Sequence, residues 1–351
     1  MTSVIGSALA IALAATIDVP AGGELAAAAA RARPGDPLRL GAGEHRGALG
    51  RLSGVRVEGA GAGRTVVTVP EGEDGAVAVG EVTLQGLSLR AGDGRCALKV
   101  LGGAARLADV ALAGGGCGAF VDAGRLDGED VTLAGGYGLL VAGGEVALAG
   151  GSARGPNAAV GVTGGAVTLR RFATIGPARE GGVSVARGAV TLEGVVIRAP
   201  GPVGITVSAG GRVEGVGVTV AGASDWNGVL GDCVQVIRST LRLTGATLLG
   251  CAGAAVEASG GDLALAGVDA SGGSAGCVVL MNGASAALAG NLCAGRGPGL
   301  VAASGAKATA EANRWWTDPV LWVDCGSGAR VHLGRGESAR QPCDPAHPAP
   351  Q

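Results

Sequence analysis

The stretch from residue 76 to residue 157 repeats itself. In register it reads AVAVGEVTLQGLSLRAGDGRC (76–96), ALKVLGGAARLADVALAGGGC (97–117), GAFVDAGRLDGEDVTLAGGY (118–137) and GLLVAGGEVALAGGSARGPN (138–157). Each block of 20 or 21 residues holds a short apolar strand, a glycine-marked turn, a second alternating strand and a glycine-rich turn. A repeat of this length predicts a stacked solenoid, because one unit cannot bury its own apolar face and a column of units can.

Similar blocks continue to residue 319 and predict an all-β, single-stranded parallel β-helix of about eleven coils. The composition fits this prediction, since 70 glycines and 47% hydrophobic residues among 351 let the chain turn often while it buries a continuous core. The length alone would allow two or three domains. Because the repeat runs through most of the chain, we expect one elongated domain over residues 16–335.

The segment before the repeats carries a family resemblance. Residues 16–47 predict a strand, a short helix at about 24–32, a Pro34-Gly35-Asp36 turn and another strand. The chain supplies VPAGGEL, ARPGDPLRLGAGEHRG and VRVEGAGAGRTVV in that order. In this order of elements it resembles right-handed parallel β-helix proteins of the pectate-lyase-like group, which have the pectin lyase fold. The resemblance implies right-handed coiling and a helix that caps the N-terminal end of the column. The catalytic motifs of that group are not found at matching positions, so no catalytic residue is carried over.

The N-terminus predicts export. Residues 1–15 contain a compact apolar run that ends in Ala12-Leu13-Ala14, the small-x-small pattern of a signal-peptidase site, although no Lys or Arg precedes it. The alternatives are a first β-strand or an incorrectly assigned start codon. Export would place the protein outside the cell, at the cell surface or in the periplasm. No later segment has about 18 uninterrupted apolar residues, so we expect no transmembrane span in the mature chain.

Eight cysteines fit an oxidising compartment. Cys96 and Cys117 each precede a new block and should stack on adjacent coils about 4.8 Å apart, which suits a disulfide. Equivalent places in neighbouring coils also predict Cys233–Cys251. For the last four, sequential pairing is the first interpretation: Cys277–Cys293 and Cys325–Cys343. The second of these would tie down a flexible proline-rich tail over residues 336–351. No CxxC spacing occurs and the three histidines are scattered, so we expect no metal site.

The outward-facing residues of the first strand in each block show whether the chain carries a catalytic pair of carboxylates. They are predicted to form a ladder of Lys99, Phe120, Leu140, Gly161, Ser184, Thr206, Gln235, Ala255, Val278 and Val301, with no carboxylate. Asp122 and Glu257 should lie two residues further along and about 29 Å apart, too far to flank one bond. The formal charge of −2 argues against a nucleic-acid partner. No cofactor is expected, with weak calcium binding at the acidic turn of residues 71–74 as an alternative.

A loop over residues 222–232 exceeds the usual block length and gathers acidic, aromatic and amide groups. The candidate ligand-binding residues are Asp225, Trp226, Asn227, Asp232, Gln235 and Arg238. Trp226 could stack on a sugar ring while the polar groups bond its hydroxyls. The alternative is a simple insertion in which Trp226 covers apolar surface.

Three functions are therefore compatible with the sequence. The preferred one is a secreted or cell-surface, non-catalytic β-helix scaffold that is carbohydrate-associated and monomeric. The second is a divergent polysaccharide lyase or glycoside hydrolase acting beside the 222–232 loop. The third is a structural component of an envelope assembly, with a protein partner along the apolar stretch from Phe120 to Leu140.

Overall fold

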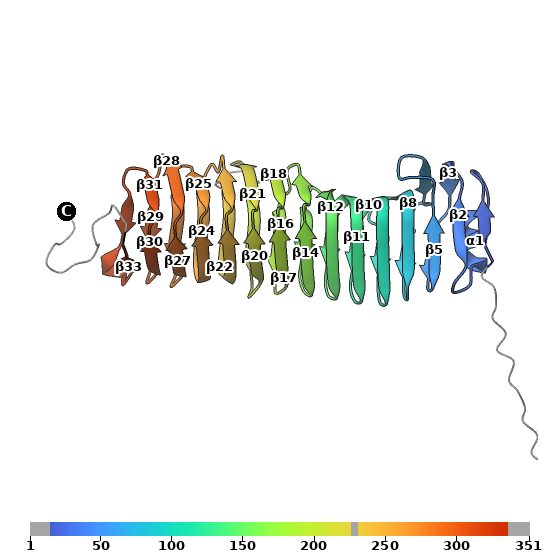
Figure 1. Ribbon diagram of the computed structural model, residues 1–351, viewed down its shortest axis with the longest axis horizontal. Helices are drawn as coiled ribbons and strands as arrows, with labels where there is room; N and C mark the ends of the chain where they lie inside the picture. The colour runs from blue at the N-terminus through green and yellow to red at the C-terminus, as the bar shows by residue number, and fades with distance from the viewer. Residues whose placement is uncertain (1–14, 226–230, 336–351) are drawn as a thin grey trace, which may run out of the picture.

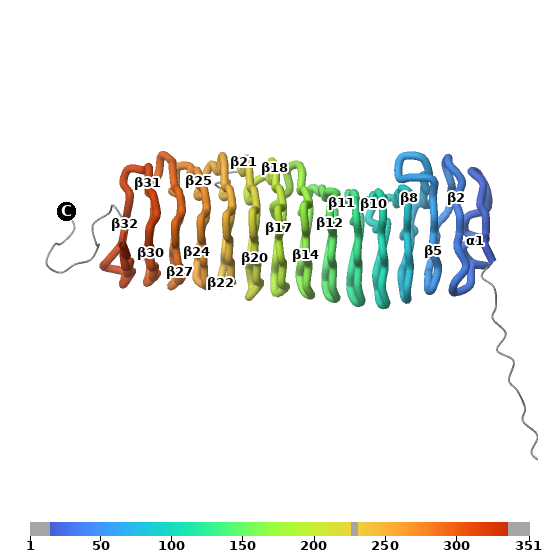
Figure 2. The backbone as a smooth tube through the Cα atoms, viewed as in Figure 1, coloured from blue at the N-terminus to red at the C-terminus, as the bar shows by residue number. Residues whose placement is uncertain are grey.

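The computed structural model describes residues 15–225 and 231–335. They form one elongated column in which the chain winds from the N-terminal end to the C-terminal end (Figures 1 and 2). The column is an all-β parallel solenoid, as the repeat predicts, but it has about 14 turns instead of eleven. The expected number was too low because the segments before residue 76 and after residue 319 stack on the column as well.

Each turn contributes to three parallel sheets, which we call the ladder face, the second face and the third face. The ladder face contains β4 (Gly50–Leu52), β7 (Ala76–Ala78), β9 (Cys96–Val100), β13 (Ala158–Val162), β16 (Gly181–Ala186), β19 (Val203–Ser208), β26 (Gly276–Met281), β29 (Leu300–Ala302) and β32 (Leu321–Val323). The second face contains β1 (Ile17–Val19), β2 (Pro37–Leu40), β5 (Val55–Glu58), β14 (Ala166–Arg170), β17 (Ala189–Glu193), β20 (Arg212–Val216), β27 (Ser285–Ala289), β30 (Lys307–Glu311) and β33 (Arg330–Leu333).

The third face contains β3 (Gly43–Arg46), β6 (Thr65–Thr68), β15 (Ala173–Ile175), β18 (Val196–Gly201), β21 (Thr219–Ala223), β23 (Thr247–Leu249), β25 (Asp269–Gly272), β28 (Leu292–Gly295) and β31 (Arg314–Trp316). Six longer strands pass through a bend and serve two or three faces: β8 (Val82–Ala91), β10 (Ala104–Val121), β11 (Arg125–Val141), β12 (Glu145–Arg154), β22 (Asp232–Thr244) and β24 (Ala254–Ala266). The sequence blocks predict only two strands each, because the third is short and rich in glycine.

The core follows from the alternating pattern. In β14, Val167 and Leu169 are buried while Ala166 and Arg170 are exposed, and the same alternation recurs in β17. Equivalent residues of successive turns pair directly, so the aliphatic side chains stack in continuous rows inside the column. Since each row is buried by its neighbours on adjacent turns, no single turn is stable alone.

The sharp bend between the second and third faces requires a left-handed backbone. One residue with φ near +60° recurs there, as at Gly245, Gly267 and Gly290. Glycine adopts this conformation without the steric penalty that a Cβ imposes. Glycine fills this position in most turns, and Asp109, Asp130, Arg171 and Ala312 fill it in others.

The capping helix predicted for residues 24–32 is present as α1 (Leu25–Arg31). Leu25, Ala28 and Ala29 are buried against the first turns of the column, at the i, i+3 and i+4 spacing of one helix face. Near the other end lies one 3₁₀ helix, η1 (Cys325–Ser327), with the Asp324 side chain accepting a hydrogen bond from the Ser327 N–H. The helix α1 covers the apolar end of the column, which would otherwise expose its core and a strand edge.

Each of three disulfides includes a cysteine at or next to the start of a ladder-face strand. All three pairs are those that the sequence predicts. They join Cys96 to Cys117, Cys233 to Cys251 and Cys277 to Cys293, with Cα separations of 4.5, 5.3 and 6.2 Å. No helix among the described residues is long and apolar enough to cross a membrane. Disulfides of this number are typical of exported proteins. The predicted signal peptide and proline-rich tail lie outside the described residues, apart from Ala15, so the domain limits remain predictions.

We expect the fourth disulfide to join Cys325 and Cys343. Cys325 is disulfide-bonded, and the other six described cysteines are paired with one another; Cys343 lies outside the described residues. Peptide mapping of a non-reduced digest should recover a linked peptide that contains both residues. A Cys325 peptide that reacts with a thiol reagent, or that links two chains, would contradict this pairing.

Candidate functional site

The outward ladder on the ladder face contains one carboxylate, Glu257, which the sequence predicts to lie two residues beyond the ladder. The predicted order is confirmed from Lys99 to Gln235. The next residues are Glu257 and Val279, so Ala255 and Val278 were assigned wrongly. In β24 three consecutive buried residues precede Glu257, and the bend before this strand adds residues that shift the register. The same shift corrects the position of Glu257, which lies in the ladder itself.

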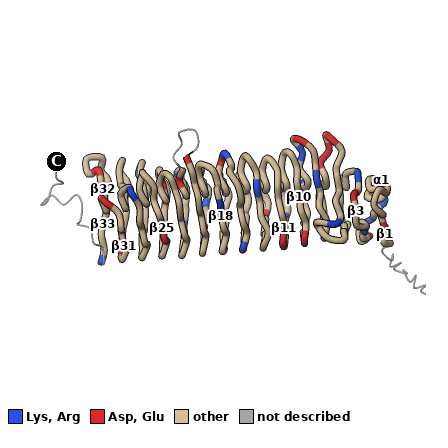
Figure 3. The backbone as a smooth tube through the Cα atoms, turned by 90° about the horizontal axis from the view of Figure 1, so that it is seen from above, with Lys and Arg blue, Asp and Glu red and all other residues tan. Residues whose placement is uncertain are grey.

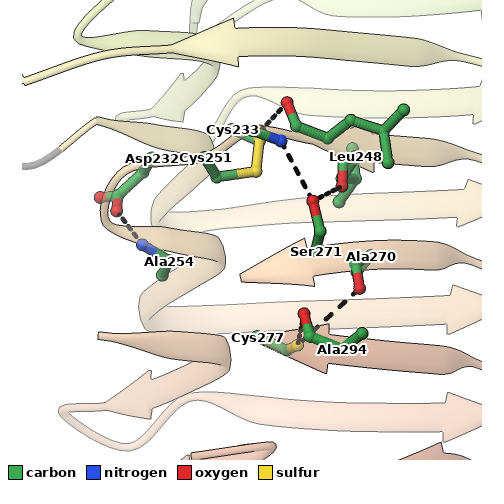
Figure 4. The surroundings of a disulfide bond; sticks show 11 residues. Asp232, Cys233, Leu248, Cys251, Ala254, Ala270, Ser271, Cys277 and Ala294 are labelled. Carbon is green, nitrogen blue, oxygen red and sulfur yellow. Dashed lines mark hydrogen bonds between the residues drawn. A yellow bond between two sulfur atoms is a disulfide. The ribbon is translucent and has the colours of Figure 1, made fainter. Parts of the chain in front are cut away.

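Glu257 meets a second carboxyl group at the corner of the column. Asp232 begins β22 and is only 4% exposed, and its Oδ1 accepts a hydrogen bond of 2.6 Å from the Ala254 N–H. Figure 4 shows the Asp232 side chain directed toward Ala254, while the adjacent Cys233 forms its disulfide with Cys251. Burial raises the pKa of Asp232 to about 6, and the charge and hydrogen bond of Glu257 raise it further, against the lowering effect of the Ala254 N–H. Asp232 therefore keeps its proton to a higher pH than an exposed aspartate does.

A second corner of the column has the same backbone geometry, but there the partner of the buried aspartate is a cation. Asp74 accepts a hydrogen bond of 3.1 Å from the Cys96 N–H and lies 2.7 Å from the Lys99 ammonium group. Lys99 follows Cys96 by three residues, just as Glu257 follows Ala254. Burial acts to raise the pKa of Asp74, but the hydrogen bonds from Lys99 and Cys96 and the charge of Lys99 leave it lowered. One backbone geometry thus gives an ion pair at one end of the column and an acid pair toward the other.

A row of hydrogen-bonding side chains runs along the ladder face and ends at Glu257. They come from four consecutive turns, and we call them the polar row: Ser184, Thr206, Gln235 and Glu257. Turns stack about 4.8 Å apart, so the row extends for roughly 14 Å. All four side chains are partly exposed between buried neighbours. The row therefore offers hydroxyl, amide and carboxyl groups at regular spacing.

The only tyrosine of the chain lies beyond the Ser184 end of the polar row. The Tyr137 hydroxyl donates a hydrogen bond of 2.9 Å to Glu180 Oε1, and Thr206 Oγ1 donates one of 3.3 Å to the Glu180 backbone carbonyl. A Cβ at Gly161 would lie 3.1 Å from the Tyr137 ring, so glycine at this position lets the ring pack closely. The half-buried ring is thereby fixed on the ladder face.

The predicted site residues are only partly brought together. Asp232 and Gln235 both lie on the ladder face. Arg238 lies in the bend between the ladder face and the second face, with φ of +48°, six residues after Asp232. Asp225 is exposed at the end of the third face, while Trp226 and Asn227 lie outside the described residues. Thr206, Ser184 and Glu257 were visible in the sequence but were not recognised as one row, because the register of Glu257 was wrong.

Neither a metal centre nor a continuous basic stripe is evident in the part of the chain that the structure describes. It has no group of three or more His, Cys, Asp or Glu side chains suited to a metal ion. In the acidic turn proposed as a weak calcium site, the Asp74 carboxylate is engaged by Lys99 and by the Cys96 N–H. Figure 3 shows acidic and basic residues of the described chain scattered along the column, with no continuous basic stripe.

Comparison with known proteins supports the fold. No family model matches the chain, and no curated protein matches it. A solved structure of the Dettilon tailspike protein (gp208) is similar with a TM-score of 0.50 and 10% identity, over 88% of this chain and 63% of that chain. The A-module of mannuronan C-5 epimerase AlgE4 from Azotobacter vinelandii matches with a TM-score of 0.47 and 13% identity, over 85% of this chain and 90% of that one. The catalytic domain of a GH87 α-1,3-glucanase in complex with tetrasaccharides matches with a TM-score of 0.40 and 12% identity, over 92% and 69%. Because the match covers 63% of the tailspike protein, this chain spans less than two thirds of that protein's length. The fold is a parallel β-helix, consistent with the right-handed β-helix of the pectate-lyase-like group that the sequence resembles.

Proposed function

We propose that the protein is an exported, non-catalytic β-helix scaffold that binds a polysaccharide along the ladder face. The observation that carries this proposal is the polar row, in which four consecutive turns each present one hydrogen-bonding side chain. A linear glycan presents hydroxyl groups along its length, and hydroxyl, amide and carboxyl side chains are suitable partners for them. A rigid column holds these partners at fixed positions and so lowers the entropy cost of binding.

Burial of Asp232 favours binding over hydrolysis. A glycosidase needs two carboxyl groups that both reach the scissile bond, one on each side. Asp232 is 4% exposed and has one oxygen committed to the Ala254 N–H. We therefore assign Asp232 the role of positioning Glu257, whose side chain is partly exposed. Glu257 then contributes a hydrogen-bond partner at the end of the polar row.

A divergent polysaccharide hydrolase is the second candidate, and the acid pair is the observation in its favour. A carboxyl group with a pKa near 6 beside a second carboxyl group is the pattern by which such enzymes divide acid and base roles. The protein-partner hypothesis has less support, because Phe120 and Leu140 are both partly buried on the ladder face.

Binding to an array of plant, algal and bacterial polysaccharides tests the proposal. We expect wild-type protein to retain at least one polysaccharide, and Glu257→Gln or Gln235→Ala to weaken its binding about tenfold, because the first replaces an acceptor oxygen by an NH2 donor and the second removes an amide group. Glu129→Gln, an exposed glutamate of the second face, should bind as wild type does. Depolymerisation that disappears in both Glu257→Gln and Asp232→Asn would establish the hydrolase instead. Failure to bind any polysaccharide would refute the proposed function.

A further inference from the structure

A shallow groove of about 330 Å³ crosses the second face on β22, β24, β27 and β30. Its floor is formed by Ala264 and Ala287, which are equivalent residues of adjacent turns. Longer side chains surround this floor: Thr240, Arg242, Asp262, Ser285, Lys307 and Thr309. The groove exists because two successive turns place alanine where the turn before them places arginine. It lies on a different face from the polar row.

The groove carries an excess of positive charge. Arg242 and Lys307 both line it and are exposed, and neither forms an ion pair with another residue that the structure describes. Asp262 is the one carboxylate in the lining. Strand pairing places Arg242 and Lys307 three turns apart on neighbouring outward columns, a separation of about 16 Å between their Cα atoms.

The surroundings do not cancel this charge. Glu214, which pairs with Arg242 on the adjacent turn, forms an ion pair with Arg212 and interacts electrostatically with Arg242 as well, so its single charge is divided between two arginines. Arg330 follows Lys307 on the next turn and adds another cation. Because the whole chain has a formal charge of −2, this local excess is a specific feature of the groove and does not reflect a basic protein.

We propose that this groove is a second glycan-binding site and that it takes a short acidic oligosaccharide. The choice of a sugar ligand rests on the proposed function, while the requirement for negative charge rests on Arg242 and Lys307. A sugar ring lies on the alanine floor, its hydroxyl groups bond Thr240, Ser285 and Thr309, and its carboxylates face the two cations. Two sites on different faces of one rigid column would let the protein contact two segments of a polysaccharide network and gain avidity.

Calorimetric titration with trigalacturonate, with maltotriose as the neutral control, tests this proposal. We expect trigalacturonate to bind wild-type protein at least tenfold more tightly than maltotriose, and its affinity to fall as salt is added. The double variant Arg242→Ala/Lys307→Ala should lose at least tenfold in affinity. Ala287→Leu should lose binding because the longer side chain fills the floor. Ala189→Leu places the same change at an exposed alanine of the second face, four turns away, and should bind as wild type does.

The polar row provides the test that separates the two proposals. Glu257 lies on the ladder face and not in the groove. If the groove is the site, Glu257→Gln should therefore leave the affinity for trigalacturonate unchanged. If only Glu257→Gln weakens trigalacturonate, the groove proposal is overturned and the proposed function stands. If the groove variants lose affinity while the polysaccharide array shows no dependence on Glu257, the groove is supported and the polar row is refuted. Equal binding of both trisaccharides would also overturn the groove proposal.

Discussion

Replacing Asn291 by leucine is expected to lower the free energy of unfolding by about 3 to 5 kcal/mol. The Asn291 side chain is buried at the bend after β27, where Oδ1 accepts a hydrogen bond from the Val268 N–H. Its Nδ2 donates to the Leu265 carbonyl and to Asn313 Oδ1, at 3.1 and 2.8 Å. Leucine supplies none of these bonds and leaves buried backbone groups without them, at a cost of about 1–3 kcal/mol for each group.

Equilibrium denaturation, with hydrogen exchange of β25 and β28, measures this loss. Asn282→Gly is the matched control, because the Asn282 amide bonds Ser259 at the surface and its φ of +54° suits glycine. We expect the control to change stability by less than 1 kcal/mol. Asn313→Leu should destabilise as well, and the double variant should lose less than the sum, since the two asparagines share a bond. An Asn291→Leu protein as stable as wild type would show that water replaces the lost bonds.

The asparagines also show where sequence reasoning stops. Asn291 and Asn313 occupy equivalent places 22 residues apart, each directly after a residue with a left-handed backbone. That spacing is visible in the sequence, yet only the stacking of turns shows that the side chains face inward at a bend. The column itself and the Cys96–Cys117 pair were predictable because both depend only on the period of the repeat.

The acid pair could not be predicted for a different reason. Its two members come from different turns, and their meeting depends on how many residues the bend before β24 consumes. An added residue in a bend leaves no trace in the apolar pattern, whereas it moves every later side chain along the ladder. Asp232 and Glu257 were thus both noticed but were placed apart. Predicting that these two carboxyl groups meet requires the strand register, which only the structure supplies.

The acid pair is expected to make the protein less stable as the pH rises from about 4 to about 6. The pKa of Asp232 is raised from 3.8 to about 6 in the folded chain, so the folded state binds more protons than the unfolded state in this range. The stabilisation is fully present below pH 4 and is lost as the pH passes the folded pKa. A shift of this size corresponds to about 3 kcal/mol.

Asp232→Asn removes this dependence, because the asparagine keeps an acceptor for the Ala254 N–H and carries no charge to bury. We expect urea denaturation to show the variant close to wild type at pH 4 and about 2–3 kcal/mol more stable at pH 7.5. Asp74→Asn is the control with the opposite sign. The lowered pKa of Asp74 gives stability that is present above its ordinary pKa and is lost in acid, so this variant should be less stable than wild type at pH 7.5. If the difference in stability between Asp232→Asn and wild type stays constant from pH 4 to pH 7.5, then the pKa of Asp232 is not raised in the folded protein, and its role in positioning Glu257 must be abandoned.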